Sequence, residues 1–264
     1  MDDPVIVDCR FKLDDERWGE GEYAASHIPG AVYADLNRDL SGRATGTNGR
    51  HPLPDPHVLA QTFGRLGITS GVQVVAYDQD NGIWASRLWW LLRWMGHDAV
   101  AVLDGGFAKW TAEGRPATSG EERRAPREFT GTPRGQMAVD VAAVASRVGS
   151  REWRLVDARA PERYRGESEP IDRTPGHIPG AVNHFFGGNL AGDKTFRTPE
   201  ELRAQFNASL GGTSPDHVIC YCGSGVTACH NLLALEHAGL KGGKLYVGSW
   251  SEWSSDPTRP VERG

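Results

Sequence analysis

The sequence predicts an α/β protein made of two tandem copies of one domain, each a parallel sheet flanked by helices. Three observations support this prediction. The chain has 264 residues, enough for two domains of ordinary size. Short apolar runs alternate with helix-like segments along both halves. Several stretches of the first half also recur in the second half, in the same order.

The repeat is clearest near the start of each half. The stretches VIVDCRF (5–11) and SHIPGAV (26–32) return as RLVDARA (154–160) and GHIPGAV (176–182). Because the order and the spacing agree, the two halves are expected to share one fold. The segment VLDGGFAKW of the first half likewise corresponds to LYVGSWSEW of the second half.

Domain boundaries follow from the repeat and from a change in composition between its copies. We expect a first domain at 1–120, a linker at 121–138 and a second domain at 139–264. The linker region is rich in Gly, Pro and charged residues and shows no apolar periodicity, which is typical of a segment that crosses the surface.

The elements within each half are short and alternate regularly. The apolar runs predict strands at 5–9, 74–77, 100–105, 155–158, 217–221 and 244–248. Helical patterns predict helices at 55–67, 85–96, 198–211 and 228–239. The helices at 55–67 and 198–211 begin at Asp or Thr, which are good N-cap residues, and end at Gly.

Composition and charge exclude several classes of function. A net charge of −5 gives no general attraction to nucleic acid or to an anionic membrane. The apolar runs are far shorter than the roughly 20 residues that span a bilayer. The acidic N-terminus lacks a signal-peptide pattern, and four cysteines do not form a disulfide framework. We therefore expect a cytoplasmic protein that binds neither nucleic acid nor membrane.

The segment CGSGVTA (222–228) of the second half carries the strongest chemical signal. Ligands of α/β sheets bind beyond the carboxyl ends of the strands, and Cys222 follows a predicted strand directly. Gly223 and Gly225 permit the backbone angles of a tight turn, and Val226 or Thr227 begins the next helix. We expect a ring of backbone N–H groups that stabilises a Cys222 thiolate.

The other cysteines have no such setting. Cys9 and Cys220 lie in predicted strands and Cys229 lies on a predicted helix, so we interpret them as core residues. The first half has Asp78 at the place that matches Cys222. The first domain is therefore expected to keep the fold and to lack the catalytic cysteine.

The repeated HIPGA elements, the DGGFAKW segment and CGSGVTA resemble the two-domain rhodanese family, which contains thiosulfate and 3-mercaptopyruvate sulfurtransferases. The resemblance implies that Cys222 takes sulfur from a small anionic donor as a persulfide. It also implies that a thiol acceptor such as thioredoxin, or cyanide, then removes the sulfur. No metal or cofactor is expected.

The resemblance further implies roles for side chains around the loop. Ser224 would pass a proton to the leaving pyruvate enolate together with His51, which matches a family histidine. The family's aspartate falls on Asn37, with Asp35 two residues away. The resemblance does not decide whether a serine triad forms, nor whether the donor is 3-mercaptopyruvate or thiosulfate.

Substrate contacts are also implied by the resemblance. Arg159 and Arg163 match substrate-pocket arginines, whose guanidinium groups suit carboxylate or sulfonate. A second carboxylate-binding arginine of the mercaptopyruvate branch falls on Ile171, with Arg173 close by. Gly223, Gly225, Val226 and Thr227 are expected to complete the donor site.

Two other functions would also use parts of this sequence. A cysteine phosphatase would need an arginine at the end of the loop to hold phosphate oxygens, and CGSGVTACH contains none. A binding or regulatory module would use the duplicated domains only to recognise a partner, which the CGSGVTA loop disfavours. An internally duplicated chain can bury one domain against the other, so we expect a monomer.

Overall fold

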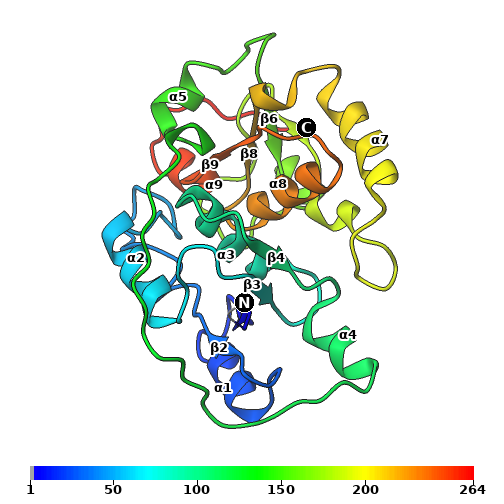
Figure 1. The fold of residues 1–264 in the computed structure, drawn as a ribbon. Helices are drawn as coiled ribbons and strands as arrows, with labels where there is room; N and C mark the ends of the chain where they lie inside the picture. The colour runs from blue at the N-terminus through cyan, green and yellow to red at the C-terminus, as the bar shows by residue number, and fades with distance from the viewer. Residues whose placement is uncertain (1–2) are drawn as a thin grey trace. The chain divides into compact units, whose positions relative to one another are not determined.

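The computed structural model describes residues 3–264, which form two compact units (Figure 1). The first unit contains the chain up to Gly42, the long stretch Leu53–Arg134 and the short stretch Gly192–Thr195. The second unit contains Gly135–Ala191 and Phe196–Gly264, and also Arg43–Pro52. A short segment that precedes Leu53 in the sequence therefore packs within the second unit.

The first unit is built on a four-stranded parallel sheet in the order β2-β1-β3-β4. Its strands are β1 (Val5–Asp8), β2 (Val32–Tyr33), β3 (Val74–Tyr77) and β4 (Val100–Val102). Its helices are α1 (Trp18–Ala25), α2 (Pro56–Arg65), α3 (Ile83–Trp94) and α4 (Gly106–Ala112). From 119 to 134 the chain has no regular secondary structure and forms backbone hydrogen bonds to its own unit, as at Arg127 and Arg134.

The second unit is built on a five-stranded parallel sheet in the order β5-β9-β8-β6-β7. Its strands are β5 (Ala138–Val139), β6 (Arg154–Asp157), β7 (Val182–Asn183), β8 (Val218–Tyr221) and β9 (Lys244–Tyr246). Its α-helices are α5 (Val141–Ala145), α6 (Pro161–Tyr164), α7 (Pro199–Leu210), α8 (Thr227–His237) and α9 (Ser249–Trp253). Its 3₁₀ turns are η1 (Gly135–Met137), η2 (Phe186–Asn189) and η3 (Pro215–His217).

The two sheets repeat one topology, which confirms the predicted α/β class and the duplication. The order β7-β6-β8-β9 of the second unit matches β2-β1-β3-β4 of the first, and β5 is added beside β9. In both sheets the two central strands end in register, Asp8 beside Tyr77 and Asp157 beside Tyr221. The residue after the second central strand therefore emerges at the carboxyl edge, where α/β folds place their sites.

The predicted helix starts at Asp55 and Thr198 are confirmed. The Asp55 carboxylate accepts the backbone N–H groups of the first turn of α2. Thr198 and Glu201 form a reciprocal capping box at the start of α7, and Gly211 ends that helix with a φ of 59°. Local residue types thus determine where both helices begin.

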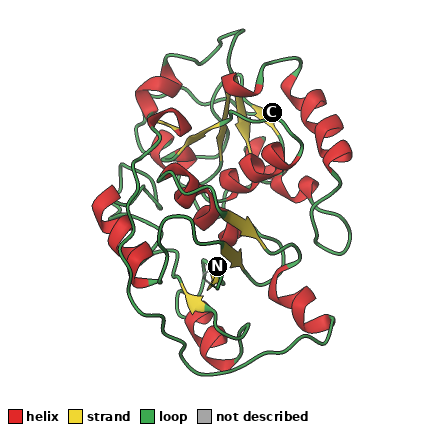
Figure 2. Cartoon of the chain, in the orientation of Figure 1, coloured by secondary structure: helices red, strands yellow, loops and turns green. Residues whose placement is uncertain are grey.

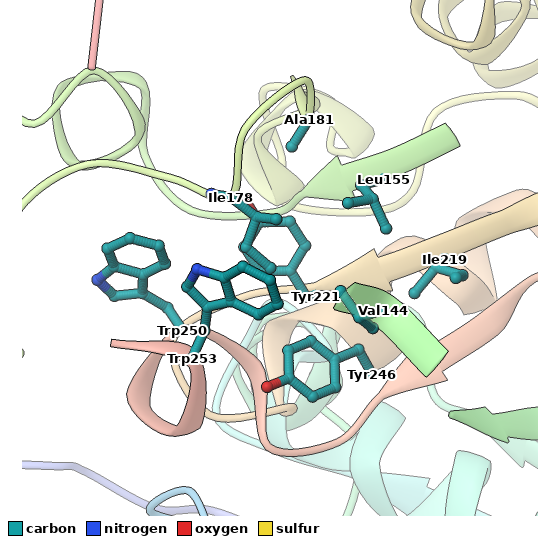
Figure 3. Close-up of a cluster of buried hydrophobic side chains, with 9 residues drawn as sticks. All are labelled: Val144, Leu155, Ile178, Ala181, Ile219, Tyr221, Tyr246, Trp250 and Trp253. Atoms are coloured by element: carbon teal, nitrogen blue, oxygen red, sulfur yellow. Dashed lines mark hydrogen bonds between the residues drawn. The ribbon is translucent and has the colours of Figure 1, made fainter. Parts of the chain in front are cut away.

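A cluster of buried side chains covers one face of the second sheet (Figure 3). Trp250 and Trp253 of α9 and Val144 of α5 pack there against strand residues such as Tyr221 and Tyr246. On the other side α8 packs against β8 and β9 and against α7, so the strands lie between two helical layers (Figure 2). Burial of these large rings anchors α9, whose first residues contact the loop after β8.

Within residues 3–264 no helix combines the length and the apolar character needed to cross a membrane.

Candidate functional site

Cys222 lies in the loop between β8 and α8 of the second unit. Strand β8 ends at Tyr221 and helix α8 begins at Thr227, so the loop spans 222–226. Cys222 is only 2 % exposed. The backbone N–H of Gly225 donates a hydrogen bond to Cys222 Sγ over 3.1 Å. This contact is one member of the predicted ring of donors, and the complete ring stays a prediction.

The start of α9 holds the backbone of this loop. Ser249 Oγ accepts the Cys222 N–H at 3.1 Å, and the Trp250 N–H donates to the Cys222 carbonyl at 2.9 Å. The Ser251 N–H donates to the Gly223 carbonyl at 2.9 Å. The sulfur-bearing residue is therefore fixed on both its N–H and its C=O side.

Ser249 was missed by sequence reasoning, although the repeat contains a signal for it. Ser249 has a φ of 53°, in the left-handed region that favours glycine. Its counterpart in the first half is Gly106, with a φ of 57°. A serine at a position where the other copy uses glycine indicates that its hydroxyl offsets the backbone strain, here by binding Cys222.

The corresponding loop of the first unit surrounds a carboxylate instead of a thiol. Asp78 is fully buried and accepts the backbone N–H groups of Gly82, Trp84 and Ala85 at 2.9, 2.8 and 3.3 Å. Burial raises the pKa of Asp78, and these N–H groups act in the opposite direction. The Phe107 N–H donates to the Asp78 carbonyl at 2.9 Å, as Trp250 does to Cys222 in the second unit. The loop thus presents several N–H groups to a buried carboxylate in the first unit, and in the second unit the Gly225 N–H to the buried sulfur.

The two glycines of the loop are required at their positions for different physical reasons. Gly225 has a φ of 79°, and a Cβ there would lie 2.4 Å from the Val247 carbonyl oxygen. Gly223 does not have a positive φ, so its backbone angle is not what calls for a glycine there. A Cβ on Gly223 would instead lie 2.8 Å from Arg50 Nη2. Glycine at 223 leaves room for a neighbouring guanidinium group.

Ser224, two residues after Cys222, lies beside His51. His51 Nδ1 is 2.8 Å from Ser224 Oγ, and both residues are buried. His51 belongs to the segment 43–52 that packs within the second unit. The structure thus brings these two predicted residues into one hydrogen bond.

Asp35 and Asn37 belong to the first unit, where Asp35 has local partners. Its carboxylate accepts the backbone N–H groups of Asn37 and Arg38, both at 2.8 Å. This carboxylate therefore caps the turn that follows β2.

Arg159 is buried in a structural network. Its guanidinium binds Asp157 at 2.6 Å and Glu169 at 3.2 Å, and it lies 4.8 Å from the centre of the Trp250 ring. Arg10 of the first unit binds Asp8 in the same way, also at 2.6 Å, in the unit that lacks the thiol. A pair repeated in both units favours a role for Arg159 in holding the fold.

Arg163 and Arg50 lie over the loop. Atoms of both guanidinium groups are within 4 Å of the Cβ position of Gly223, Arg50 Nη2 at 2.8 Å and Arg163 Nη2 at 3.6 Å. Arg163 Nη2 binds Glu169 at 2.7 Å and Asp172 at 3.2 Å. Arg50 Nη1 also pairs with Asp172. The Asp172 carboxylate therefore bridges two arginines beside Cys222.

Sequence reasoning found only part of this cluster. Arg163 was predicted, whereas Arg50, Glu169 and Asp172 were not. Glu169 and Asp172 follow Arg163 within nine residues, and acidic residues at this spacing are a signal for ion pairs. Ile171, at the position of the family's second arginine, is 46 % exposed. Arg173 is exposed as well.

The remaining predicted residues complete the loop. Val226 is 3 % exposed and is the N-cap residue of α8, and Thr227 is the first residue of that helix. Cys9, Cys220 and Cys229 are buried, as expected for core residues.

A surface pocket of about 720 Å³ lies in the first unit around Tyr23 and Tyr33, and no predicted site residue lines it.

Comparison with known proteins supports a single family. The rhodanese-like domain family matches residues 1–113 and again 140–256. A Pseudomonas aeruginosa protein described as a probable 3-mercaptopyruvate sulfurtransferase is 49% identical over 99% of this chain and 93% of its own length. The thiosulfate sulfurtransferase of Bos taurus is 36% identical over 94% of this chain and 84% of its own length.

A solved structure agrees with these relatives. The 3-mercaptopyruvate sulfurtransferase from Leishmania major superimposes with a TM-score of 0.84 at 32% identity. The match covers 95% of this chain and 70% of that protein.

Proposed function

Because the chain belongs to the rhodanese family, with two rhodanese-like domains in tandem, we propose that it is a sulfurtransferase that carries sulfur as a persulfide on Cys222. The observation that carries this proposal is the setting of Cys222. The residue follows the central strand directly and receives the Gly225 N–H on its sulfur. A thiolate there is stabilised by backbone dipoles and needs no metal.

The first half-reaction loads the sulfur. The Cys222 thiolate attacks the transferable sulfur of the donor and forms an S–S bond. With 3-mercaptopyruvate the C–S bond breaks and its electron pair passes to the pyruvate enolate. With thiosulfate the S–S bond of the donor breaks and sulfite leaves. Gly223, Gly225, Val226 and Thr227 line the loop that holds the sulfur in both cases.

The second half-reaction unloads the sulfur. An acceptor thiolate attacks the outer sulfur of the persulfide, forms a new persulfide and restores the Cys222 thiolate. Cyanide as acceptor leaves as thiocyanate. The acceptor is a small thiol, a dithiol protein such as thioredoxin, or cyanide. Splitting one transfer into two displacements at a single sulfur is covalent catalysis.

Neighbouring side chains serve the donor. Ser224 protonates the enolate and takes a proton back through His51, with which it shares a hydrogen bond. Arg163 binds the anionic end of the donor. Arg159 acts indirectly, because it holds Glu169, and Glu169 in turn orients Arg163. A monomeric state and a cytoplasmic location remain our predictions.

The test is turnover with 3-mercaptopyruvate and with thiosulfate in parallel, for the wild type and for Cys222→Ser. We expect turnover with at least one donor, a mass increase of one sulfur on Cys222 in the absence of acceptor, and no turnover by the variant. The donor with the higher kcat/KM identifies the branch. Absence of turnover and of a persulfide with both donors would refute the proposal and favour a binding module.

A further inference from the structure

We propose that Ser251 is a positioning residue that holds His51 beside Ser224. This inference rests on the proposed function, because it specifies what keeps the two members of the proposed proton relay together. Ser251 is the third residue of α9, and its backbone N–H and its hydroxyl contact two different segments of the second unit. One of these segments carries Ser224 and the other carries His51.

The backbone of Ser251 holds the loop that carries Ser224. The Ser251 N–H donates a hydrogen bond to the Gly223 carbonyl over 2.9 Å, and Gly223 directly precedes Ser224 in the chain. The matching bond exists in the first unit, where the Ala108 N–H donates to the Gln79 carbonyl, also at 2.9 Å. This backbone contact therefore belongs to the fold that both units share.

The hydroxyl of Ser251 holds the segment that carries His51. Ser251 Oγ accepts the backbone N–H of Arg50 at 3.1 Å, and Arg50 directly precedes His51 in the chain. The same hydroxyl donates to the Gly248 carbonyl at 3.2 Å. Because that second bond fixes where the hydroxyl hydrogen points, a lone pair of the oxygen is left to face the Arg50 N–H.

The segment 43–52 needs such an anchor, because it contains no helix and no strand. Its position in the second unit therefore depends on contacts with other elements. Gly49 is buried, and a Cβ there would lie 2.8 Å from the Gly248 carbonyl oxygen. The chain thus meets the start of α9 backbone to backbone at Gly49, and Ser251 binds the next residue. A displacement of about 1 Å at a catalytic group can cost about 100-fold in rate, so an anchor directly before His51 matters.

The first unit provides an internal comparison for the hydroxyl. Ala108 stands at the position that matches Ser251, so the first unit forms the shared backbone contact without a hydroxyl there. That unit also has Asp78 in place of Cys222. The hydroxyl occurs in the copy that contains the thiol, and it binds the residue before His51. This difference between the copies indicates a role in the site and not in the common fold.

The experiment compares Ser251→Thr with Ser251→Val, two side chains of nearly the same shape of which only threonine has a hydroxyl. Turnover is measured for both variants with 3-mercaptopyruvate and with thiosulfate. We expect Ser251→Thr to keep most of the wild-type kcat. Ser251→Val should lower kcat with 3-mercaptopyruvate about tenfold and change turnover with thiosulfate much less, because only the pyruvate enolate needs the relay.

A second readout follows the His51 ring and needs no sulfur transfer. The NMR chemical shift of His51 Nδ1 reports its hydrogen bond with the Ser224 hydroxyl. Ser251→Val should move this shift toward its value in Ser224→Ala, whereas Ser251→Thr should leave it near the wild-type value. Ser255→Ala is the matched control, because the Ser255 hydroxyl donates to the Glu252 carbonyl of its own segment. This control should leave both readouts as in the wild type.

The outcomes separate positioning from general support of the loop. A His51 shift that is unchanged in Ser251→Val would overturn the proposal. A fall of kcat by the same factor with both donors, or no fall with either, would also overturn it. If neither donor turns over in the wild type while the His51 shift depends on the Ser251 hydroxyl, Ser251 still positions His51 and the proposed sulfurtransferase function fails.

Discussion

The imidazole Nδ1 of His51 lies 2.8 Å from the hydroxyl oxygen of Ser224, two residues after Cys222. His51 and Ser224 come from distant parts of the chain, and both are buried in the second unit. A hydroxyl hydrogen-bonded to an imidazole can pass on a proton, which is the role we propose for this pair, and only one of the two candidate donors needs such a relay. When 3-mercaptopyruvate loses its sulfur, the pyruvate enolate that leaves must gain a proton. When thiosulfate loses its sulfur, sulfite leaves as a stable anion.

Ser224→Ala and His51→Asn should therefore affect the two donors differently. We expect kcat with 3-mercaptopyruvate to fall about 100-fold in each variant, within the range for general acid catalysis. Turnover with thiosulfate should change much less. The measurement is kcat for both donors with one acceptor. Equal losses with both donors would show that this pair supports the loop and moves no proton.

Substitution of the two loop glycines should separate folding from binding. Gly225→Ala forces a Cβ to within 2.4 Å of a backbone carbonyl at a φ of 79°, so we expect a loss of stability of at least about 2 kcal/mol. Gly223→Ala meets the side-chain ends of Arg50 and Arg163 and no backbone atom, so this variant should unfold like the wild type and show a higher donor KM. Urea unfolding and steady-state kinetics test both. Similar unfolding curves for the two variants would contradict this prediction.

Glu169 should make stability depend on pH. Burial would raise the pKa of this carboxyl, but hydrogen bonds from Arg163 and from the Asp172 and Ile171 N–H groups lower it. The lowered folded-state pKa means that its contribution is complete above the unfolded value of about 4.3 and is lost as pH falls through the folded value. Glu169→Gln should cost about 3 kcal/mol at neutral pH.

The same variant allows a direct check of the sign. The difference in unfolding free energy between the wild type and Glu169→Gln should shrink as pH falls below about 4. Urea titrations at a series of pH values measure it. A difference that stays constant over this range would show that the ion pairs with Arg163 and Arg159 are not its source.

Cysteine alkylation should be selective in the native protein. Burial raises the pKa of Cys9 and of Cys220, so neither presents a thiolate near neutral pH. Cys229 is fully buried and its Sγ lies 3.2 Å from the Gly225 carbonyl oxygen. We expect rapid iodoacetamide labelling at Cys222 alone, with the others labelled only after unfolding. Peptide mapping measures this, and fast labelling of a second cysteine would contradict it.

The carboxylate in the first unit should be structural. Asp78→Asn leaves some of the loop N–H groups that bind its carboxylate without an acceptor, so we expect a loss of about 3 kcal/mol. Asp98→Asn is the matched control, because Asp98 forms an exposed ion pair with Arg134 and should cost at most about 1 kcal/mol. Thermal unfolding compares the two. Equal costs would mean that the Asp78 cradle does not stabilise the first unit.

The sequence alone determined the duplication, the α/β class, the capped helices at Asp55 and Thr198, and the position of Cys222 at the end of a strand. These features depend on patterns within a few residues or on a comparison of the two halves. Local patterns are readable because residues close together in the chain are also close together in a strand, a turn or a helix. The duplication is readable because the two halves repeat these patterns in the same order.

The tertiary structure decided which side chains meet at the loop. Arg50 carries the same guanidinium as the exposed Arg173, and no local pattern tells these two apart. Ser249 has a left-handed angle and its hydroxyl binds a distant loop, and Arg50 approaches the place where a side chain at 223 would be. Such contacts join segments far apart in the chain. They depend on how strands and helices pack, a property that no short stretch of sequence contains.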